Sequence, residues 1–251
     1  MASYESFAQV YDLYMDNVPY DTWCHNLLTL LEKYHIPKGL VAELGCGTGK
    51  MTRLLAREGF DMIGIDNSYD MLGIAMEQGP ADILYLCQDM QAFELYGTVG
   101  AVVSVCDSIN YLPTPEDLKQ VLKLVNNYLD PDGIFIFDVN TEYKYREILG
   151  DNVFAENREH GSFIWENEYD EKSRINAYEL TLYIENEDGE TYSRYAEEHF
   201  QRAFSLEEIK KAISESGMAF VEAMDVDTME SISDTTERMY IICKEQGKEA
   251  L

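Results

Sequence analysis

The residues best suited to bind a nucleotide-like ligand lie between positions 41 and 50, where the sequence reads VAELGCGTGK. Gly45, Gly47 and Gly49 alternate with other residues in this stretch. Glycine lets a backbone turn sharply and pass close beneath a bound molecule. The stretch also leaves an apolar run and enters a helical pattern, which is where ligand-binding loops of α/β sheets occur.

Two common nucleotide-binding loops do not match this stretch. A phosphate-binding P-loop requires a glycine where Leu44 stands and a serine or threonine where Met51 stands. A dinucleotide loop of the form G-x-G-x-x-G requires its third glycine one residue later than Gly49. The pattern present is E-x-G-x-G-x-G, with Glu43 two positions before the first glycine.

The elements around this loop alternate between strand and helix. Apolar runs predict strands at 39–44, 61–66, 83–87, 100–106 and 134–139, and helical spacing predicts helices at 50–58, 68–78 and 114–129. Two more helices are expected at 7–15 and 23–31, one from 205 to 217, a turn at 130–133, and two last strands at 220–226 and 238–243. This order predicts an α/β fold with an open, doubly wound, mostly parallel sheet.

Residues 144–204 follow a different pattern, in which polar residues alternate with aromatic or aliphatic ones. That period predicts about four antiparallel strands, with a hairpin turn at 187–190. We therefore divide the chain into a core of residues 1–143 and 205–251 and an antiparallel insertion of residues 144–204. The insertion is expected to form a lid, and the side chains that could line it are Trp165, Tyr169, Tyr178, Tyr183, His160 and His199.

The glycine loop and two later acidic residues resemble the class I S-adenosylmethionine (SAM)-dependent methyltransferases, of the small-molecule type. Asp66 ends the second strand, 21 positions beyond Gly45, and Asp89 follows the third strand. The similarity extends from Val41 to Val139. It implies a seven-stranded sheet whose last strand pair breaks the parallel order, SAM as the cofactor, and methyl transfer as the reaction.

The resemblance also implies roles for individual residues. Glu43 to Gly49 would cradle the methionine end of SAM, Asp66 would hold the ribose hydroxyls, and Asp89, with the backbone of Met90, would receive the adenine amine. A carboxylate can accept both hydrogen bonds of a ribose diol. Tyr11 would close over the methionine end. Helix capping by the two aspartates, and simple packing of Tyr11, are the structural alternatives.

Polar residues at the ends of the fourth and fifth strands should face the reacting centre. Asp107 and Asp138 are the carboxylates considered for catalysis there, Asp107 also for cofactor binding, and His199 is the candidate base from the insertion. Some catechol-type relatives bind magnesium through adjacent aspartate and asparagine. Here Val139 separates Asp138 from Asn140, and no metal is expected.

Composition narrows the function further. The 251 residues carry 19 Lys plus Arg against 47 Asp plus Glu, a net charge of −28, which disfavours nucleic acid and anionic membranes as partners. We find no apolar run long enough to span a bilayer, no secretory signal at the start and no paired cysteine motif, so we expect a cytoplasmic protein.

We therefore expect methyl transfer from SAM to a small molecule. The alternatives are methylation of nucleic acid or protein on the same fold, a non-catalytic SAM-binding sensor or assembly factor, and a nicotinamide-dependent dehydrogenase. The acceptor, the methylated atom and the oligomeric state are not predicted by the sequence.

Overall fold

The structure is a computed structural model that describes residues 18–248. The helix expected at 7–15 lies outside the described residues. Seven strands form the core sheet: β1 (Leu40–Leu44), β2 (Asp61–Asp66), β3 (Leu84–Cys87), β4 (Val99–Ser104), β5 (Leu129–Asn140), β10 (Ala219–Asp225) and β11 (Arg238–Lys244). Their helices are α2 (Tyr20–Lys33), α3 (Lys50–Arg57), α4 (Tyr69–Gln78), α5 (Pro115–Tyr128) and α6 (Leu206–Ser216).

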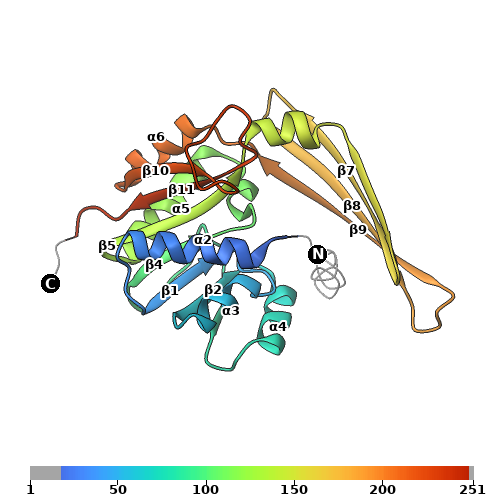
Figure 1. Cartoon of the computed structure of the whole chain (residues 1–251), viewed down its shortest axis with the longest axis horizontal. Coiled ribbons are helices and arrows are strands. Elements are labelled where there is room, and N and C mark those ends of the chain that lie inside the picture. The colour runs from blue at the N-terminus through green and yellow to red at the C-terminus, as the bar shows by residue number, and fades with distance from the viewer. Residues whose placement is uncertain (1–17, 249–251) are drawn as a thin grey trace.

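The core sheet has the strand order β3-β2-β1-β4-β5-β11-β10. The first five strands run parallel, and β11 is antiparallel to both β5 and β10. The predicted doubly wound, seven-stranded sheet is therefore confirmed. Because β11 is reversed, its first residues lie at the same edge as the last residues of β4 and β5. Figure 1 shows this sheet in the left half of the molecule.

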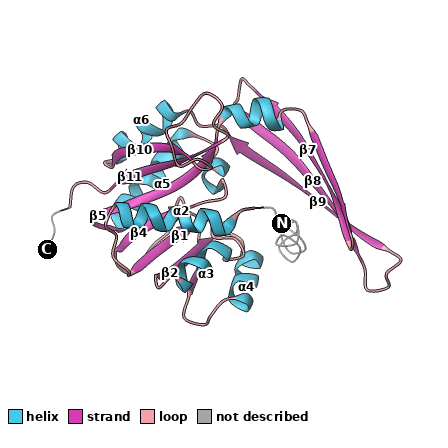
Figure 2. Ribbon diagram, in the orientation of Figure 1, coloured by secondary structure: helices cyan, strands magenta, loops and turns pink. Residues whose placement is uncertain are grey.

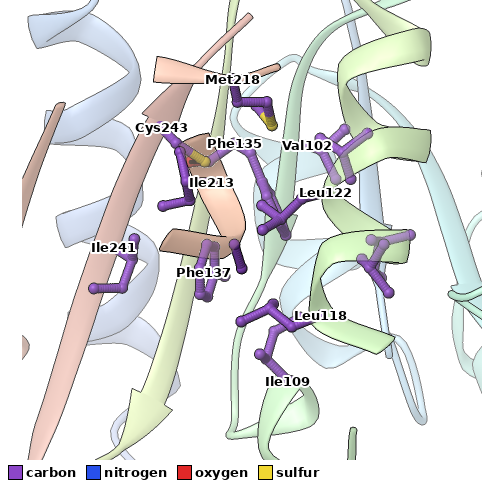
Figure 3. Packing of buried hydrophobic residues seen from close by; sticks show 14 of the residues in the cluster. Val102, Ile109, Leu118, Leu122, Phe135, Phe137, Ile213, Met218, Ile241 and Cys243 are labelled. Carbon is purple, nitrogen blue, oxygen red and sulfur yellow. Dashed lines mark hydrogen bonds between the residues drawn. The ribbon is translucent and has the colours of Figure 1, made fainter. Parts of the chain in front are cut away.

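Helices cover both faces of the sheet because successive strand side chains point to opposite sides. Apolar residues of α2 and α3 pack on one face, against Val41, Ala101 and Ile136. Those of α5 and α6 pack on the other, and Figure 3 shows Leu122 and Ile213 there beside Phe135. This double burial explains why the central strands are almost wholly apolar.

The helix starts follow from their caps. Ser68 accepts a hydrogen bond from the backbone of Met71, and Thr114 accepts one from Asp117. Ser205 and Glu208 form the expected capping box. These three confirmed starts fix where α4, α5 and α6 leave the loops that precede them.

The prediction of a turn at residues 130–133 is wrong. The residues Asp130-Pro131-Asp132-Gly133 lie inside β5, because Leu129 already pairs with Val99 at the end of α5. The pairing resumes at Ile134 with Ala101, so the four residues form a bulge, in which Asp132 has a φ of 67°. Pairing with β4 on both sides of the segment makes it part of the strand.

The segment between β5 and α6 forms a second, four-stranded antiparallel sheet, which we call the insertion sheet. Its strands, in spatial order, are β6 (Val153–Arg158), β7 (Gly161–Asp170), β8 (Ile175–Glu185) and β9 (Tyr192–Arg202). A short π-helix, η2 (Lys144–Leu149), connects β5 to the first strand of this sheet, and the sequence pattern does not predict it. Figure 2 shows that these strands begin near the upper end of the core and extend along one side of it, on the right of the view. No helix within residues 18–248 has the length and apolarity to cross a membrane.

Candidate active site

The glycine loop follows β1 directly and is held against β2. The backbone nitrogens of Gly45 and Cys46 both donate to the carbonyl of Ile65, at 2.8 and 3.1 Å. Gly45, Gly47 and Gly49 have φ values of 68°, 53° and 74°, a region that favours glycine. A β-carbon on Gly45 would lie 2.5 Å from the Ser108 hydroxyl, whereas one on Gly47 would meet nothing within 4 Å. The loop is therefore tightly packed at its first glycine and open at its second.

A hollow of about 200 Å³ lies beyond the carboxyl ends of β1, β2 and β3. It is lined by Gly45, Gly47, Ile65, Asp66, Asn67, Ser68, Met71, Gln88, Asp89, Met90, Ser108, Tyr111 and His199. The glycine loop, both aspartates of the cofactor pattern and one residue of the insertion sheet thus meet in one place. This is the edge where α/β sheets bind their ligands.

Asp66 is tied to both loops that border the hollow. Its Oδ2 accepts a hydrogen bond from the nitrogen of Gly47 at 2.8 Å, and its Oδ1 accepts one from the nitrogen of Ser68 at 2.8 Å. Burial raises the pKa of the carboxyl, and these backbone donors oppose the rise. Asp66 therefore both orders the glycine loop and presents a carboxylate to the hollow.

Asp89 and Met90 form the wall at the end of β3. The Oδ1 of Asp89 accepts a hydrogen bond from the nitrogen of Gln91 at 2.8 Å, which closes a local turn. The side chain of Asp89 thus caps its own loop and also lines the hollow. The capping and ligand-binding interpretations of this residue are compatible.

Glu43 and Gly49 do not line the hollow. Glu43 is buried beneath the loop, where its carboxyl accepts a hydrogen bond from the hydroxyl of Thr52. Burial raises the pKa of Glu43 to about 8, and the Thr52 bond opposes that rise. A β-carbon on Gly49 would clash with the hydroxyl of Tyr85. Both residues support the loop from below.

Asp107, whose side chain is 22% exposed, and Asp138 belong to one ion-pair cluster beside the hollow. Arg238, the first residue of β11, donates to Asp138 Oδ2 at 3.0 Å and to Asp107 Oδ1 at 2.6 Å. Gln201, from β9 of the insertion sheet, donates to Asp107 Oδ2 at 2.5 Å. Asp138 has no exposed surface. This placement favours positioning over contact with an acceptor as the role of Asp138.

The cluster also holds an unusual backbone. Cys106 and Asp107 have φ values of 60° and 54°, which cost energy in residues other than glycine. The carboxylate of Asp138 accepts hydrogen bonds from the backbone nitrogens of both residues, at 3.0 and 2.7 Å. This fixes the turn that carries Ser108 and Tyr111 to the hollow.

His199 joins the insertion sheet to the hollow. Its Nδ1 lies 3.2 Å from the hydroxyl of Tyr111, and its Nε2 lies 3.2 Å from Oε2 of Glu197. The ring stacks on that of Tyr178, with centroids 4.7 Å apart, and the Tyr178 hydroxyl is 2.8 Å from that of Tyr111. A carboxylate on one side and a phenol on the other fix the orientation of the imidazole.

The structure therefore brings most predicted cofactor residues together. The predicted site residues that line the hollow are Gly45, Gly47, Asp66, Asp89, Met90 and His199. Those that lie behind it are Glu43, Gly49, Asp107 and Asp138, and Tyr11 lies outside the described residues. The sequence places Ser108 and Tyr111 in a loop expected to face the reacting centre but assigns neither a role, and it does not point to Gln201 or Arg238. The run Ser-Ile-Asn-Tyr after the fourth strand was a signal for the first two, because polar residues after a buried strand lie at the binding edge.

The geometry fits a nucleoside, whose hydroxyl and amino groups require hydrogen-bond acceptors. The open backbone at Gly47 leaves room for close approach, and the Asp66 carboxylate faces the hollow as an acceptor. Asp89 supplies a second acceptor on the adjoining wall. No group of three or more histidine, cysteine or acidic residues within positions 18–248 is arranged to hold a metal ion.

Known proteins share both the sequence and the architecture. Residues 41–133 match a family model described as "Methyltransferase domain". "Putative methyltransferase YqeM" of Bacillus subtilis (strain 168) is 36% identical over 242 residues, which cover 94% of this chain and 95% of that protein.

Two further comparisons extend this result. The crystal structure of a SAM-dependent methyltransferase from Clostridium acetobutylicum ATCC 824 superposes with a TM-score of 0.87, at 27% identity, over 97% of this chain and 99% of the other. A "dTDP-3-amino-3,4,6-trideoxy-alpha-D-glucopyranose N,N-dimethyltransferase" of Streptomyces venezuelae is 29% identical over 133 residues, 52% of this chain and 56% of that protein.

Proposed function

Because the chain belongs to the class I SAM-dependent methyltransferases, we propose that it methylates a small polar molecule held between the hollow and the insertion sheet. The observation that carries the proposal is the hollow itself, where the glycine loop, Asp66, Asp89 and His199 converge. When bound, SAM supplies a methyl group on a sulfonium, which is a good leaving group. Alignment of donor and acceptor then removes much of the barrier.

The chain's own residues divide the work of binding. In our proposal Asp66 accepts the ribose hydroxyls, Asp89 and the backbone of Met90 receive the adenine, and the backbone at Gly45 and Gly47 approaches the methionine end. Glu43 and Gly49 shape the loop from beneath. Tyr11 keeps its proposed role of covering the methionine end.

His199 is our proposed general base. Its Nε2 lies 3.2 Å from Oε2 of the buried Glu197, which orients the ring, and its Nδ1 faces the hydroxyl of Tyr111 at the wall of the hollow. A proton released by the acceptor would pass toward the imidazole, directly or through Tyr111. Asp107 and Asp138 hold the turn before Tyr111, so we propose that they act by positioning.

Three observations support a small-molecule acceptor. The net charge of −28 disfavours a nucleic acid. The insertion sheet reaches the hollow through His199 and is tied to Asp107 of the core by Gln201, which suits a lid that walls off an acceptor and excludes water. The Streptomyces venezuelae relative acts, by its name, on a nucleotide sugar.

Calorimetry with S-adenosylhomocysteine and with NAD tests the proposal. We expect binding of the former only, and an Asp66→Ala variant should bind it tenfold to a hundredfold more weakly, about 2–3 kcal/mol for a lost charge-assisted fork. Asp61→Ala is the matched control, because Asp61 is exposed at the opposite end of the same strand. Equal affinity in both variants would reduce Asp66 to a loop support. Binding without turnover on any acceptor would favour a sensor.

A further inference from the structure

The inner face of the insertion sheet, meaning the face that carries His199, holds an unusual number of unsatisfied polar atoms. Among the described residues, ten buried side-chain nitrogen or oxygen atoms have no hydrogen-bond partner. Five of the ten belong to this face: Trp165 Nε1, Asn167 Nδ2, Tyr169 OH, Asn176 Oδ1 and Glu197 Oε1. A buried polar atom without a partner costs about 1–3 kcal/mol, so such a concentration needs an explanation.

Strand register places these atoms on one surface. Trp165 pairs with Leu180, and Leu180 pairs with Glu197, so the three side chains form one row across β7, β8 and β9. The next row along is Asn167, Tyr178 and His199. Directly paired residues of an antiparallel sheet share a face.

The same face is continuous with the cofactor hollow. His199 lines the hollow, and Glu197 lies beside it, bonded through Oε2 to the imidazole. At the end of this face nearer the hairpin, Leu182 packs against Met71 of α4, and at the other end Tyr169 stacks on Tyr145 of η2, with ring centroids 6.0 Å apart. The polar rows thus lie between two apolar contacts and beside the proposed position of the methyl group.

Glu197 is the decisive residue. Its side chain is 3% exposed, and Oε1 has no partner within residues 18–248. A buried carboxylate oxygen strongly favours a cationic donor. Trp165 Nε1 and Asn167 Nδ2 are donors, and as such favour hydroxyl or carbonyl oxygens on the same ligand.

We propose that this face is the acceptor subsite, and that it takes a hydroxylated amine whose ammonium group binds Glu197. The inference rests on the proposed methyltransferase function and names its substrate class. Two aromatic rings share this face with Glu197, since Trp165 and Tyr178 lie edge to face with centroids 5.7 Å apart, and aromatic faces attract cations. The net charge of −28 also draws cations toward the molecule.

The chemistry balances with the residues present. An ammonium must lose a proton before its nitrogen can accept a methyl group. The N–H bond breaks, its electron pair stays on the nitrogen, and the proton passes to the Glu197–His199 pair. The neutral amine is then the nucleophile: its lone pair would form the new N–C bond to the methyl group while the C–S bond breaks, and the electron pair of that bond would leave on the sulfur of S-adenosylhomocysteine.

The test uses the full-length protein saturated with S-adenosylhomocysteine and three matched sets of probes. The amines are ethanolamine, serinol and glucosamine; the alcohols are ethylene glycol, glycerol and glucose; the acids are glycolate, glycerate and gluconate. Calorimetry should show binding by amines at least about tenfold tighter than by the alcohols, and none by the acids. Equal or tighter binding of alcohols or acids, or no binding by any amine, overturns the proposal.

Two variants locate the site. Glu197→Gln should lose at least about tenfold in amine affinity, whereas Glu198→Gln should not, because Glu198 is the exposed neighbour on the opposite face. Trp165→Phe should weaken glucosamine but leave ethanolamine unchanged, since it removes one donor and keeps a ring. If Glu197→Gln melts like wild type and binds amines equally well, the assignment is wrong.

S-Adenosylhomocysteine affinity, measured first in each variant, separates the two hypotheses. If the wild-type protein does not bind S-adenosylhomocysteine, the proposed function is refuted. If it binds S-adenosylhomocysteine but does not prefer amines to alcohols and acids, the amine subsite alone is refuted.

Discussion

Replacing Arg238 by methionine should destabilise the protein strongly, because it leaves a buried charge without its partner. The guanidinium donates to Asp138 at 3.0 Å and to Asp107 at 2.6 Å. Asp138 is wholly buried, so water cannot replace the lost donor. Breaking a buried ion pair from one side typically costs about 3–5 kcal/mol, and we expect a loss in this range near neutral pH.

Urea unfolding followed by circular dichroism measures this loss. Arg146→Met is the matched control, because Arg146 forms an ion pair with Glu147 at a similar 2.7 Å but is 46% exposed. Exposed pairs contribute about 0–1 kcal/mol, so the control should unfold close to wild type. The contrast tests burial, since both variants delete one guanidinium.

The pH dependence provides a second signature. Burial raises the pKa of Asp138 even though Arg238 opposes the rise, and the pKa should rise further in the variant. A carboxyl with a raised folded-state pKa adds stability below its unfolded value and loses it as pH increases. The deficit of Arg238→Met should therefore narrow as pH falls. A deficit below about 1 kcal/mol, or one equal at every pH, would refute the reasoning.

Two other predictions concern the glycine loop. Because burial raises the pKa of Glu43 from 4.5 to about 8, the free energy of unfolding of the wild type should fall by up to about 1.4 kcal/mol per pH unit between those values, and Glu43→Gln should abolish that fall. Urea unfolding at several pH values measures this, and parallel wild-type and variant curves would contradict it. Gly45→Ala should lower the free energy of unfolding by about 1–3 kcal/mol and weaken S-adenosylhomocysteine binding, because φ is 68° and the new methyl group would overlap Ser108. Gly73→Ala, in open space within α4, should raise that free energy by about 0.5–1 kcal/mol. Similar melting temperatures of the two variants would contradict this.

The sequence was sufficient to predict the parts of the fold that depend on local pattern. The doubly wound, mostly parallel sheet followed from the alternation of strands and helices, and the caps at Ser68, Thr114 and Ser205 set the helix starts. The hairpin also follows from local residues, because Gly189 has a φ of 66° in the turn between β8 and β9. Such features involve neighbours in sequence, so their residue types carry the signal.

Features that depend on distant pairing were not predictable. Arg238 reaches Asp138 across 100 positions because β11 is reversed, and Gln201 reaches Asp107 because β9 returns to the core. Neither residue belongs to a motif. The bulge in β5 likewise depends on Val99 pairing before the turn sequence begins. Asp138 was a catalytic candidate from its strand-end position, but its burial depends on these same partners.

The alternation along β9 constrains how this enzyme can change length during evolution. Glu197, His199 and Gln201 point inward, and the exposed Glu198 and Phe200 point outward. A single residue gained or lost between the hairpin and the core would turn every inward side chain to solvent. Divergence in acceptor preference should therefore proceed by substitution within β9, while gains and losses collect at the hairpin tip, in steps that preserve which residues face the site.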